Sequence, residues 1–298
     1  MPRAVSWLPV MHTPGAIAAE IEEVAGWIQG QLPGRGRGLR VLEVGCGPGH
    51  LAARLLRDGV AVTAIDASEE QVAKARELGV AAIVSDFLAF EGEPFDALLF
   101  TRSLHHLWPL EAALGKIRAL AAPGGLILAD EFAHDRIDAP TATWFWDLQA
   151  VLEEGGVLAP DVPRHPHHPD HRHGHRPRGE GPPPLDPVER WHQRHLHDPL
   201  LHRSGAMVAA LRRAFVLRAA ERCPYLHRYF SERVADGEQG TRLFLRVRAL
   251  ERLRVEQGLL VPIGLRLVAV ARRPRLRRQA TASSGGRVRR KAARKRRS

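Results

Sequence analysis

The sequence predicts an α/β fold built on a doubly wound, mostly parallel sheet. Short apolar runs alternate along the chain with amphipathic stretches of about ten residues, the pattern of strands joined by crossover helices. The apolar runs are continuous and do not alternate with polar residues, as in strands that are covered on both faces. A chain of 298 residues, 44% of them apolar, is long enough to bury one substantial core.

The first half of the chain carries most of the sheet. Ile17, Ile21, Val24 and Ile28 recur at helical spacing, so a lead-in helix is expected over residues 14–30. A glycine-rich turn at residues 34–38 ends it. The periodicity then predicts five strands, at residues 41–44, 60–65, 80–84, 95–100 and 126–129. It predicts helices between them at residues 50–58, 68–78 and 109–121.

The second half supplies fewer regular elements. A helix containing Trp144, Leu148 and Leu152 is expected to end near Gly155. Regular patterning resumes with a helix over 207–215, a strand over 216–223, a helix over 241–257 and a strand over 263–271. The two late strands would complete the sheet.

Composition divides the chain into five segments. Residues 160–187 are rich in proline and histidine and almost without aliphatic side chains, so they are expected to form a disordered insertion. The predicted division is an N-terminal helix and lead-in (1–38), a core (39–159), the insertion (160–187), the C-terminal part of the same fold (188–271) and a disordered basic tail (272–298).

The net charge of +11 belongs to the tail. Thirteen of the 44 Lys and Arg residues lie in residues 272–298, which contain no acid, so 31 basic and 33 acidic side chains remain in residues 1–271. The folded part is therefore not expected to read nucleic acid. The tail is expected to contact polyanions nonspecifically, since it has no aromatic residue on which bases could stack.

Cysteine content and hydropathy indicate the compartment. Cys46 and Cys223 are the only cysteines, too few for a disulfide framework or a Cys-rich zinc site. No run of about 18 apolar residues exists, and residues 1–15 lack the features of an export signal. A cytoplasmic protein with no membrane partner is expected, and the sequence leaves its oligomeric state open.

A glycine loop joins the first predicted strand to the following helix. Gly45, Gly47 and Gly49 stand at alternate positions, where glycine permits unusual dihedrals and lets a ligand approach the backbone. Asp66 closes the next strand, 21 residues after Gly45, where a carboxylate can accept the hydroxyls of a ribose. Together these residues predict a site for a nucleoside-bearing cofactor.

The details of the loop indicate which cofactor it binds. In a dinucleotide fingerprint the third glycine comes one residue later, where this chain has His50. Glu43 precedes the loop and would repel a pyrophosphate, but it suits a cofactor with a positively charged amino-acid end. Three more motifs follow in order, Ser85-Asp86-Phe87 after the third strand, residues 101–107 after the fourth and residues 122–128 at the turn into the fifth.

With these motifs, residues 38–132 resemble the class I S-adenosylmethionine-dependent methyltransferases, in particular their type 11 and type 12 domains. The resemblance implies a Rossmann-like, seven-stranded sheet that is mostly parallel with an antiparallel terminal strand, and S-adenosylmethionine as cofactor. It assigns cofactor contacts to Glu43, Gly45, Cys46, Gly47, Gly49, Asp66, Ala67, Asp86, Phe87 and Arg102. The ordinary interpretation of Cys46 is a small residue that fits the loop, and an alternative use of Arg102 is to hold an anionic substrate.

His105 and His106 are the candidate catalytic residues. A histidine beside the transferred methyl group could remove a proton from an oxygen or nitrogen acceptor. The same pair could also shape the pocket or cap the following helix. Both interpretations stay open at this point.

No metal site is predicted. His192, His195 and His197 match no standard ligand spacing, and the histidines of residues 165–175 are explained by the biased composition of the insertion. A magnesium-assisted mechanism is disfavoured because the fifth strand ends in Asp130 and Glu131 where metal-dependent relatives carry Asp-Asn. The aromatic side chains of residues 144–146 could line an acceptor cavity, but core packing is the more ordinary use of such residues.

The predicted function is methyl transfer from S-adenosylmethionine to a small-molecule acceptor by in-line displacement, with residues 1–38 and 142–215 covering the acceptor. The alternative is an RNA- or ribosome-associated methyltransferase-like protein that docks through its basic tail. A nicotinamide-dependent oxidoreductase is a third, more distant alternative. Methylation of DNA amino groups is disfavoured because no Asn-Pro-Pro-Tyr segment follows the fourth strand.

Overall fold

The computed structural model describes residues 15–159, 186–196 and 199–272. Nearly all of the expected insertion (160–187) and basic tail (272–298) therefore lies outside the described residues. None of the described helices is both long and apolar enough to cross a bilayer.

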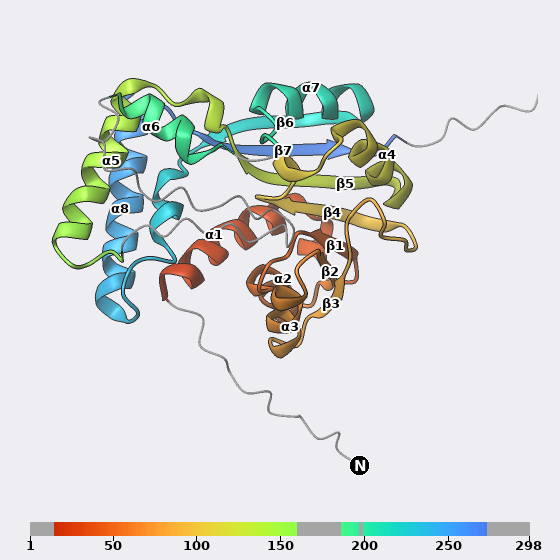
Figure 1. The fold of residues 1–298 in the computed structure, drawn as a ribbon. Coiled ribbons are helices and arrows are strands. Elements are labelled where there is room, and N and C mark those ends of the chain that lie inside the picture. Colours follow the sequence, from red (N-terminus) through yellow and green to blue (C-terminus); the bar gives the residue numbers. More distant parts are fainter. Residues whose placement is uncertain (1–14, 160–185, 197–198, 273–298) are drawn as a thin grey trace, which may run out of the picture.

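Seven strands form one sheet in the order β3-β2-β1-β4-β5-β7-β6 (Figure 1). They are β1 Arg40–Val44, β2 Ala61–Asp66, β3 Ala81–Val84, β4 Phe95–Thr101, β5 Ala121–Phe132, β6 Val216–Cys223 and β7 Gly264–Val270. The first five strands pair in parallel, whereas β7 runs antiparallel to both β5 and β6. The predicted fold class is confirmed, and the antiparallel strand, last in the chain, lies in space between β5 and β6.

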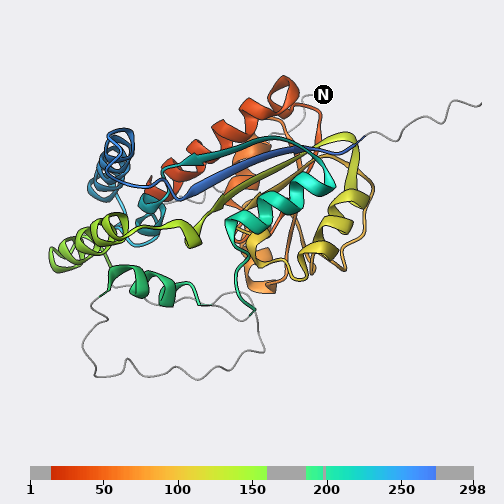
Figure 2. The ribbon, with the colours of Figure 1, turned by 90° about the horizontal axis from the view of Figure 1, so that it is seen from above.

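Helices cover both faces of this sheet, as the continuous apolar strands predict (Figure 2). One face packs against α4 (Leu110–Leu120) and α7 (Ser204–Ala214). The other packs against α1 (Gly15–Gln31), α2 (His50–Arg57) and α3 (Glu69–Glu77). The expected helices are confirmed to within a few residues for all of these elements, as are the strands other than β5.

A third apolar cluster forms a cap beyond the carboxyl ends of the parallel strands (Figure 1, left). Its elements are α5 (Ala139–Glu154), α6 (Pro187–Arg194), the 3-10 helix η4 (Leu226–Phe230) and α8 (Glu238–Glu256). The expectation that residues 142–215 all cover the acceptor was wrong for α7. Because Met207 and Leu211 are buried against the sheet, α7 is part of the main core instead.

Two features of the cap differ from the sequence prediction. α6 was not expected, because its eight residues give too little periodicity, but Trp191 is fully buried and donates a hydrogen bond to the His134 carbonyl at 2.9 Å. β5 is longer than the predicted 126–129 at both ends, since Ala121 pairs with Phe95 of β4 and residues 130–132 pair with β7. The extension brings Asp130 and Glu131 to the boundary between sheet and cap.

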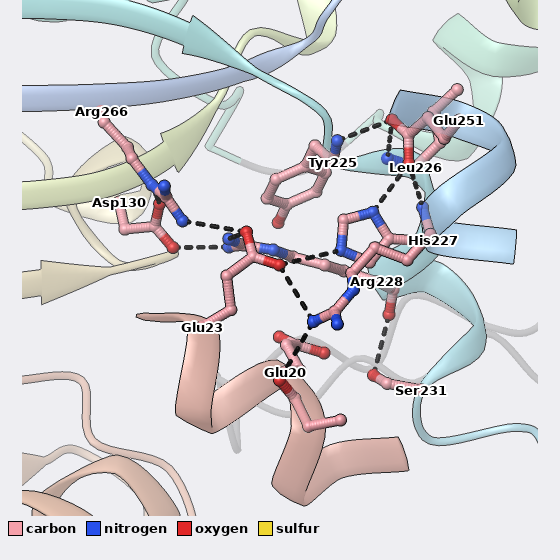
Figure 3. A network of polar contacts seen from close by, with 12 residues as sticks. Glu20, Glu23, Asp130, Tyr225, Leu226, His227, Arg228, Ser231, Glu251 and Arg266 are labelled. Atoms are coloured by element: carbon pink, nitrogen blue, oxygen red, sulfur yellow. Dashed lines mark hydrogen bonds and ion pairs between the residues drawn. The ribbon is translucent and has the colours of Figure 1, made fainter. Parts of the chain in front are cut away.

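Buried charges fasten the cap to the sheet and to α1 (Figure 3). Asp130, which is 1% exposed, accepts hydrogen bonds from Arg228 of η4 and from Arg266 of β7. Glu23 of α1 forms ion pairs with Arg266 at 3.1 Å and with Arg248 of α8 at 3.3 Å. One charge network therefore joins α1, β5, β7, η4 and α8 at the end of the sheet where a ligand site is expected.

We expect Arg228→Met to lower the free energy of unfolding by about 3 kcal/mol, because it removes one of the two cations that compensate the buried Asp130 carboxylate. Arg242→Met, which breaks an exposed ion pair with Glu238, is the matched control. It should cost less than about 1 kcal/mol. Urea unfolding measures both changes, and equal losses for the two variants would contradict the importance of the network.

Candidate functional site

The glycine loop leaves open space at its centre. Residues 45–49 connect β1 to α2, and both Gly47 (φ 53°) and Gly49 (φ 78°) have left-handed backbone conformations. A Cβ atom on Gly49 would lie 2.6 Å from the Cβ of Ala75, so this glycine permits α2 to pack against α3. A Cβ atom on Gly47 would meet nothing within 4 Å. The backbone at Gly47 is therefore accessible to a ligand.

Asp66 holds this loop from the neighbouring strand. Its carboxylate accepts a hydrogen bond from the Gly47 N–H at 2.8 Å through Oδ2 and from the Ser68 N–H at 2.9 Å through Oδ1. The side chain is buried, whereas the following Ala67 is exposed. The loop and the acid that the sequence paired thus lie in direct contact, and each carboxylate oxygen has a second lone pair for a ligand.

Glu43 is a buried acid at the base of the loop. It is 1% exposed, and its Oε1 accepts a hydrogen bond from the Thr101 hydroxyl at 3.4 Å. Its Oε2 is buried without a hydrogen-bond partner. Burial raises the pKa of Glu43 to about 8. An unpartnered carboxylate oxygen next to open loop backbone fits a ligand with a positively charged amino group, as the amino-acid end of S-adenosylmethionine has.

We expect Glu43→Gln to remove part of the pH dependence of stability. Because the folded-state pKa of Glu43 lies above its ordinary value of 4.5, the protonated form stabilises the fold, and this contribution is lost as the pH rises towards 8. The full shift corresponds to roughly 5 kcal/mol. Between about pH 5 and pH 8.5 the free energy of unfolding of the wild type should therefore fall relative to that of Glu43→Gln. The relative fall should amount to at most the roughly 5 kcal/mol of the full shift.

Urea unfolding at both pH values measures this difference. Glu131 titrates in both proteins and cancels from the comparison. Glu70→Gln, a change at an exposed carboxylate paired with Lys74, should show little pH dependence of the same kind. Parallel pH profiles for the wild type and Glu43→Gln would show that Glu43 ionises normally in the folded protein.

The residues expected at the adenine side differ in exposure. Asp86 is exposed and accepts a hydrogen bond from the Leu88 N–H at 2.7 Å. The Phe87 ring is 3% exposed and packs edge-on against Phe100. Cys46 likewise points into the core, at 7% exposure. Phe87 and Cys46 can therefore offer a cofactor their backbone atoms and not their side chains.

Arg102 is paired within the protein. Its backbone adopts a left-handed φ of 57°, and its Nη1 forms an ion pair with Glu20 of α1 at 3.1 Å. The Glu20 side chain is 5% exposed and that of Arg102 is 41% exposed. In this structure Arg102 is fastened to α1, and its side chain remains partly exposed.

His105 and Glu131 form a buried pair at the ends of β4 and β5. His105 is 2% exposed and Glu131 is fully buried, and the His105 Nδ1 hydrogen-bonds with Glu131 Oε2. The other carboxylate oxygen, Oε1, accepts the backbone N–H groups of Ser103 at 3.0 Å and Leu104 at 2.7 Å. Burial raises the pKa of Glu131 to about 8. This is the arrangement of a histidine whose orientation and tautomer are fixed by an acid.

The structure distinguishes the two candidate catalytic histidines. His106 is half-buried, and its ring centroid lies 4.2 Å from that of His105. Among the contacts described, only His105 of the two has a hydrogen bond to Glu131. Sequence reasoning missed Glu131 as a partner because the two residues are 26 positions apart. The available signal was that adjacent parallel strands bring their carboxyl ends together.

The other predicted clusters do not converge on a site. His195 is buried, with Nδ1 2.8 Å from the Trp191 carbonyl and Nε2 2.8 Å from the Tyr229 hydroxyl, whereas His192 is exposed. His197 and the histidines of residues 165–175 lie outside the described residues. In the part of the chain that the structure describes, no three His, Cys, Asp or Glu side chains are grouped to hold a metal. Of the aromatic run, Phe145 and Trp146 pack in the core of the cap.

Comparison with known proteins supports the motif assignment. Residues 41–125 match the family model described as a methyltransferase domain. This part of the chain is therefore similar to a methyltransferase domain, in agreement with the resemblance that its motifs carry. The domain is similar to the ubiquinone biosynthesis O-methyltransferase of Caulobacter sp. (strain K31), with 36% identity over 100 residues, 30% of this chain and 40% of that protein. It is also similar to an uncharacterized methyltransferase of Geobacillus thermodenitrificans, with 36% identity over 136 residues, 41% of this chain and 63% of that protein.

Among solved structures, an S-adenosylmethionine dependent methyltransferase from Mesorhizobium loti superposes with a TM-score of 0.49 at 16% identity, covering 84% of this chain and 99% of that chain. The chain spans about two fifths of the length of the ubiquinone biosynthesis relatives that it matches. The matched methyltransferase domain contains every residue predicted to bind the cofactor and also His105. Glu131 and the cap lie outside the residues that the family model matches.

Proposed function

We propose that the protein is an enzyme that transfers a methyl group from S-adenosylmethionine to a hydroxyl group of a small-molecule acceptor. The observation that carries the proposal is the contact between the accessible Gly47 backbone and the Asp66 carboxylate, beside the unpartnered Oε2 of Glu43. Glu43, Gly47 and Asp66 would hold the cofactor, together with the backbone of residues 45–49. The bound cofactor supplies an electrophilic methyl group.

His105 is the proposed general base. When Glu131 is ionised it accepts the Nδ1 proton of His105, which makes Nε2 the basic nitrogen of the ring. His105 then takes the proton of the acceptor hydroxyl at Nε2, while Glu131 stabilises the positive charge that forms on the ring. The resulting oxygen anion is the nucleophile. The relatives are named O-methyltransferases, which supports an oxygen acceptor.

Excluding water is the proposed role of the cap. Phe132, at the end of β5, stacks on Tyr225 with ring centroids 5.1 Å apart and contacts His105 edge-on at 4.9 Å. An aromatic wall of this kind next to the base lowers the local polarity and favours a planar, apolar acceptor. In-line displacement needs mainly alignment of acceptor and methyl donor, which such a wall can provide.

The alternative of an RNA- or ribosome-associated protein depends on residues 272–298, which lie outside the described residues. Deleting them separates the two functions. We expect the truncated protein to retain methyl transfer to its small-molecule acceptor, and loss of turnover would favour the alternative. The cytoplasm remains the proposed location, and the free thiols of Cys46 and Cys223 suit a reducing compartment.

Isotope transfer tests the main proposal. Isothermal titration calorimetry should detect S-adenosylmethionine binding in the micromolar range. Incubating the purified protein with a cell extract and a donor that carries a ¹³C-labelled methyl group should yield a labelled small molecule by mass spectrometry. Binding without any labelled product would refute the enzyme, and absence of binding by a folded protein would refute the cofactor as well.

A further inference from the structure

Residues 199–203, here called the strap, lie across the loop that carries His105. The backbone N–H of His202 donates a hydrogen bond to the His105 carbonyl at 3.0 Å. The His202 side chain donates a second one through Nε2 to the Leu107 carbonyl at 2.9 Å. His202 is 6% exposed, so both bonds are shielded from water.

Trp108, which follows Leu107 in the same loop, adds two more contacts with the strap. Its indole Nε1–H donates a hydrogen bond to the Leu200 carbonyl at 2.7 Å, and its ring stacks on His202 with centroids 4.0 Å apart. Trp108 is nevertheless 45% exposed. A large aromatic side chain at the surface is thus held in one orientation by the strap.

The end of the strap is fastened to the segment that follows β5. The backbone N–H of Ser204, the first residue after the strap, donates a hydrogen bond to Asp135 Oδ1 at 3.0 Å. Leu201 is buried in the apolar cluster of the cap. The strap therefore connects the segments that follow β4 and β5. His105 lies in the first of these segments, and Glu131 lies near the end of β5, four residues before Asp135.

We propose that the strap positions the His105–Glu131 pair and that His202 is the positioning residue through which it acts; the inference rests on the proposed role of His105 as base. His105 lies in a single 3-10 turn, Leu104–His106, too short to fix a side chain by its own backbone hydrogen bonds. The strap binds the carbonyls of His105 and Leu107, one within this turn and one just after it. A base must be held to within about 0.5 Å of its productive position.

Two substitutions at His202 separate hydrogen bonding from packing. His202→Phe keeps a ring that can stack on Trp108 but lacks the Nε2 donor. His202→Gln keeps an N–H donor near the position of Nε2 but lacks the ring. His192→Phe, the same change at an exposed position of α6, is the control. Circular dichroism and thermal unfolding verify that each variant folds.

The first readout needs no acceptor. In ¹⁵N-histidine-labelled protein, long-range ¹H–¹⁵N spectra report the tautomer of each ring, and the His105 signals are identified by their loss in His105→Gln. We expect one tautomer for His105 in the wild type at pH 9, with Nδ1 protonated, and a mixture in His202→Phe. Calorimetry with S-adenosylhomocysteine as the probe should give the same affinity for all variants within about twofold.

Turnover provides the second readout once an acceptor is known. We expect kcat to fall about tenfold in His202→Phe at an unchanged KM for the donor, and His202→Gln to recover most of the loss. Unchanged His105 signals in a folded His202→Phe variant would overturn the proposal, as would equal impairment of both His202 variants. If His202→Phe does not fold, the same spectra are recorded for Trp108→Phe, which keeps an aromatic ring but loses the indole donor to Leu200. A mixture of His105 tautomers would support the strap, and unchanged signals would overturn it.

Failure of the proposed function is distinguishable from failure of the strap. Absence of methyl transfer by the wild type would refute the enzyme, while the ring spectra would still report whether the strap fixes His105. The spectra therefore test the inference on the protein itself.

Discussion

Asp66→Ala is expected to weaken S-adenosylmethionine binding about 100-fold or more. The Asp66 carboxylate accepts the Gly47 N–H at 2.8 Å and the Ser68 N–H at 2.9 Å, so it fixes the glycine loop, and it is also the residue proposed to bind the ribose. A hydrogen bond to a charged group contributes about 1.5–3 kcal/mol, and two such bonds are lost along with the ribose contact. Calorimetric titration with the cofactor measures the change.

Asp96→Ala is the matched control for this experiment. Asp96 also accepts a backbone hydrogen bond, from the Arg40 N–H at 2.9 Å. This bond lies where β1 and β4 begin, at the end of the sheet opposite to the glycine loop. Its removal should leave cofactor affinity unchanged. Asp66→Asn, which keeps one acceptor oxygen, should fall between the wild type and Asp66→Ala. An Asp66→Ala protein that binds the cofactor like the wild type would remove the basis of the proposed site.

The cofactor side of the site was predictable because its signals are local in sequence. Gly45–Gly49 motifs are recognised within a few residues, and Asp66 ends the strand that pairs directly with β1, as shown by the register of Val44 with Ile65. Glycine is required where φ is positive, so the residue type itself reports the backbone conformation. The alternation of strands and helices likewise fixed the fold class before any contact was known.

The contacts around His105 were not predictable in the same way. His105 meets Glu131 across 26 residues, and the His202 ring meets Leu107 across 95 residues. Neither contact leaves a periodic trace in the sequence, since each depends on how strands and connections pack in three dimensions. The helix α6 shows the same limit, although Asp186 followed by Pro187 is a helix-start signal that could have been used.

Glu131→Gln is expected to lower kcat by about 100-fold or more while changing cofactor affinity by less than about twofold. The amide oxygen can still accept the N–H groups of Ser103 and Leu104, so the fold of the turn is retained. The amide nitrogen then faces the His105 Nδ1 as a donor. It favours the tautomer with the proton on Nε2, and in that form His105 cannot accept a proton from the acceptor. Glu111→Gln, at an exposed carboxylate, is the control for the substitution itself.

The pH profile separates this effect from a general loss of structure. Burial raises the pKa of Glu131 to about 8, so in the wild type the carboxyl is mainly protonated below that pH and donates to the His105 Nδ1, which again places the ring proton on Nε2. As the pH rises through about 8, Glu131 ionises and His105 becomes a base at Nε2, so kcat of the wild type should increase across this range. Glu131→Gln has no group to ionise there, and its low kcat should stay flat. If kcat of Glu131→Gln rises with pH in parallel with that of the wild type, another group titrates in this range. The pH profile would then give no support to Glu131 as the residue that makes His105 a base.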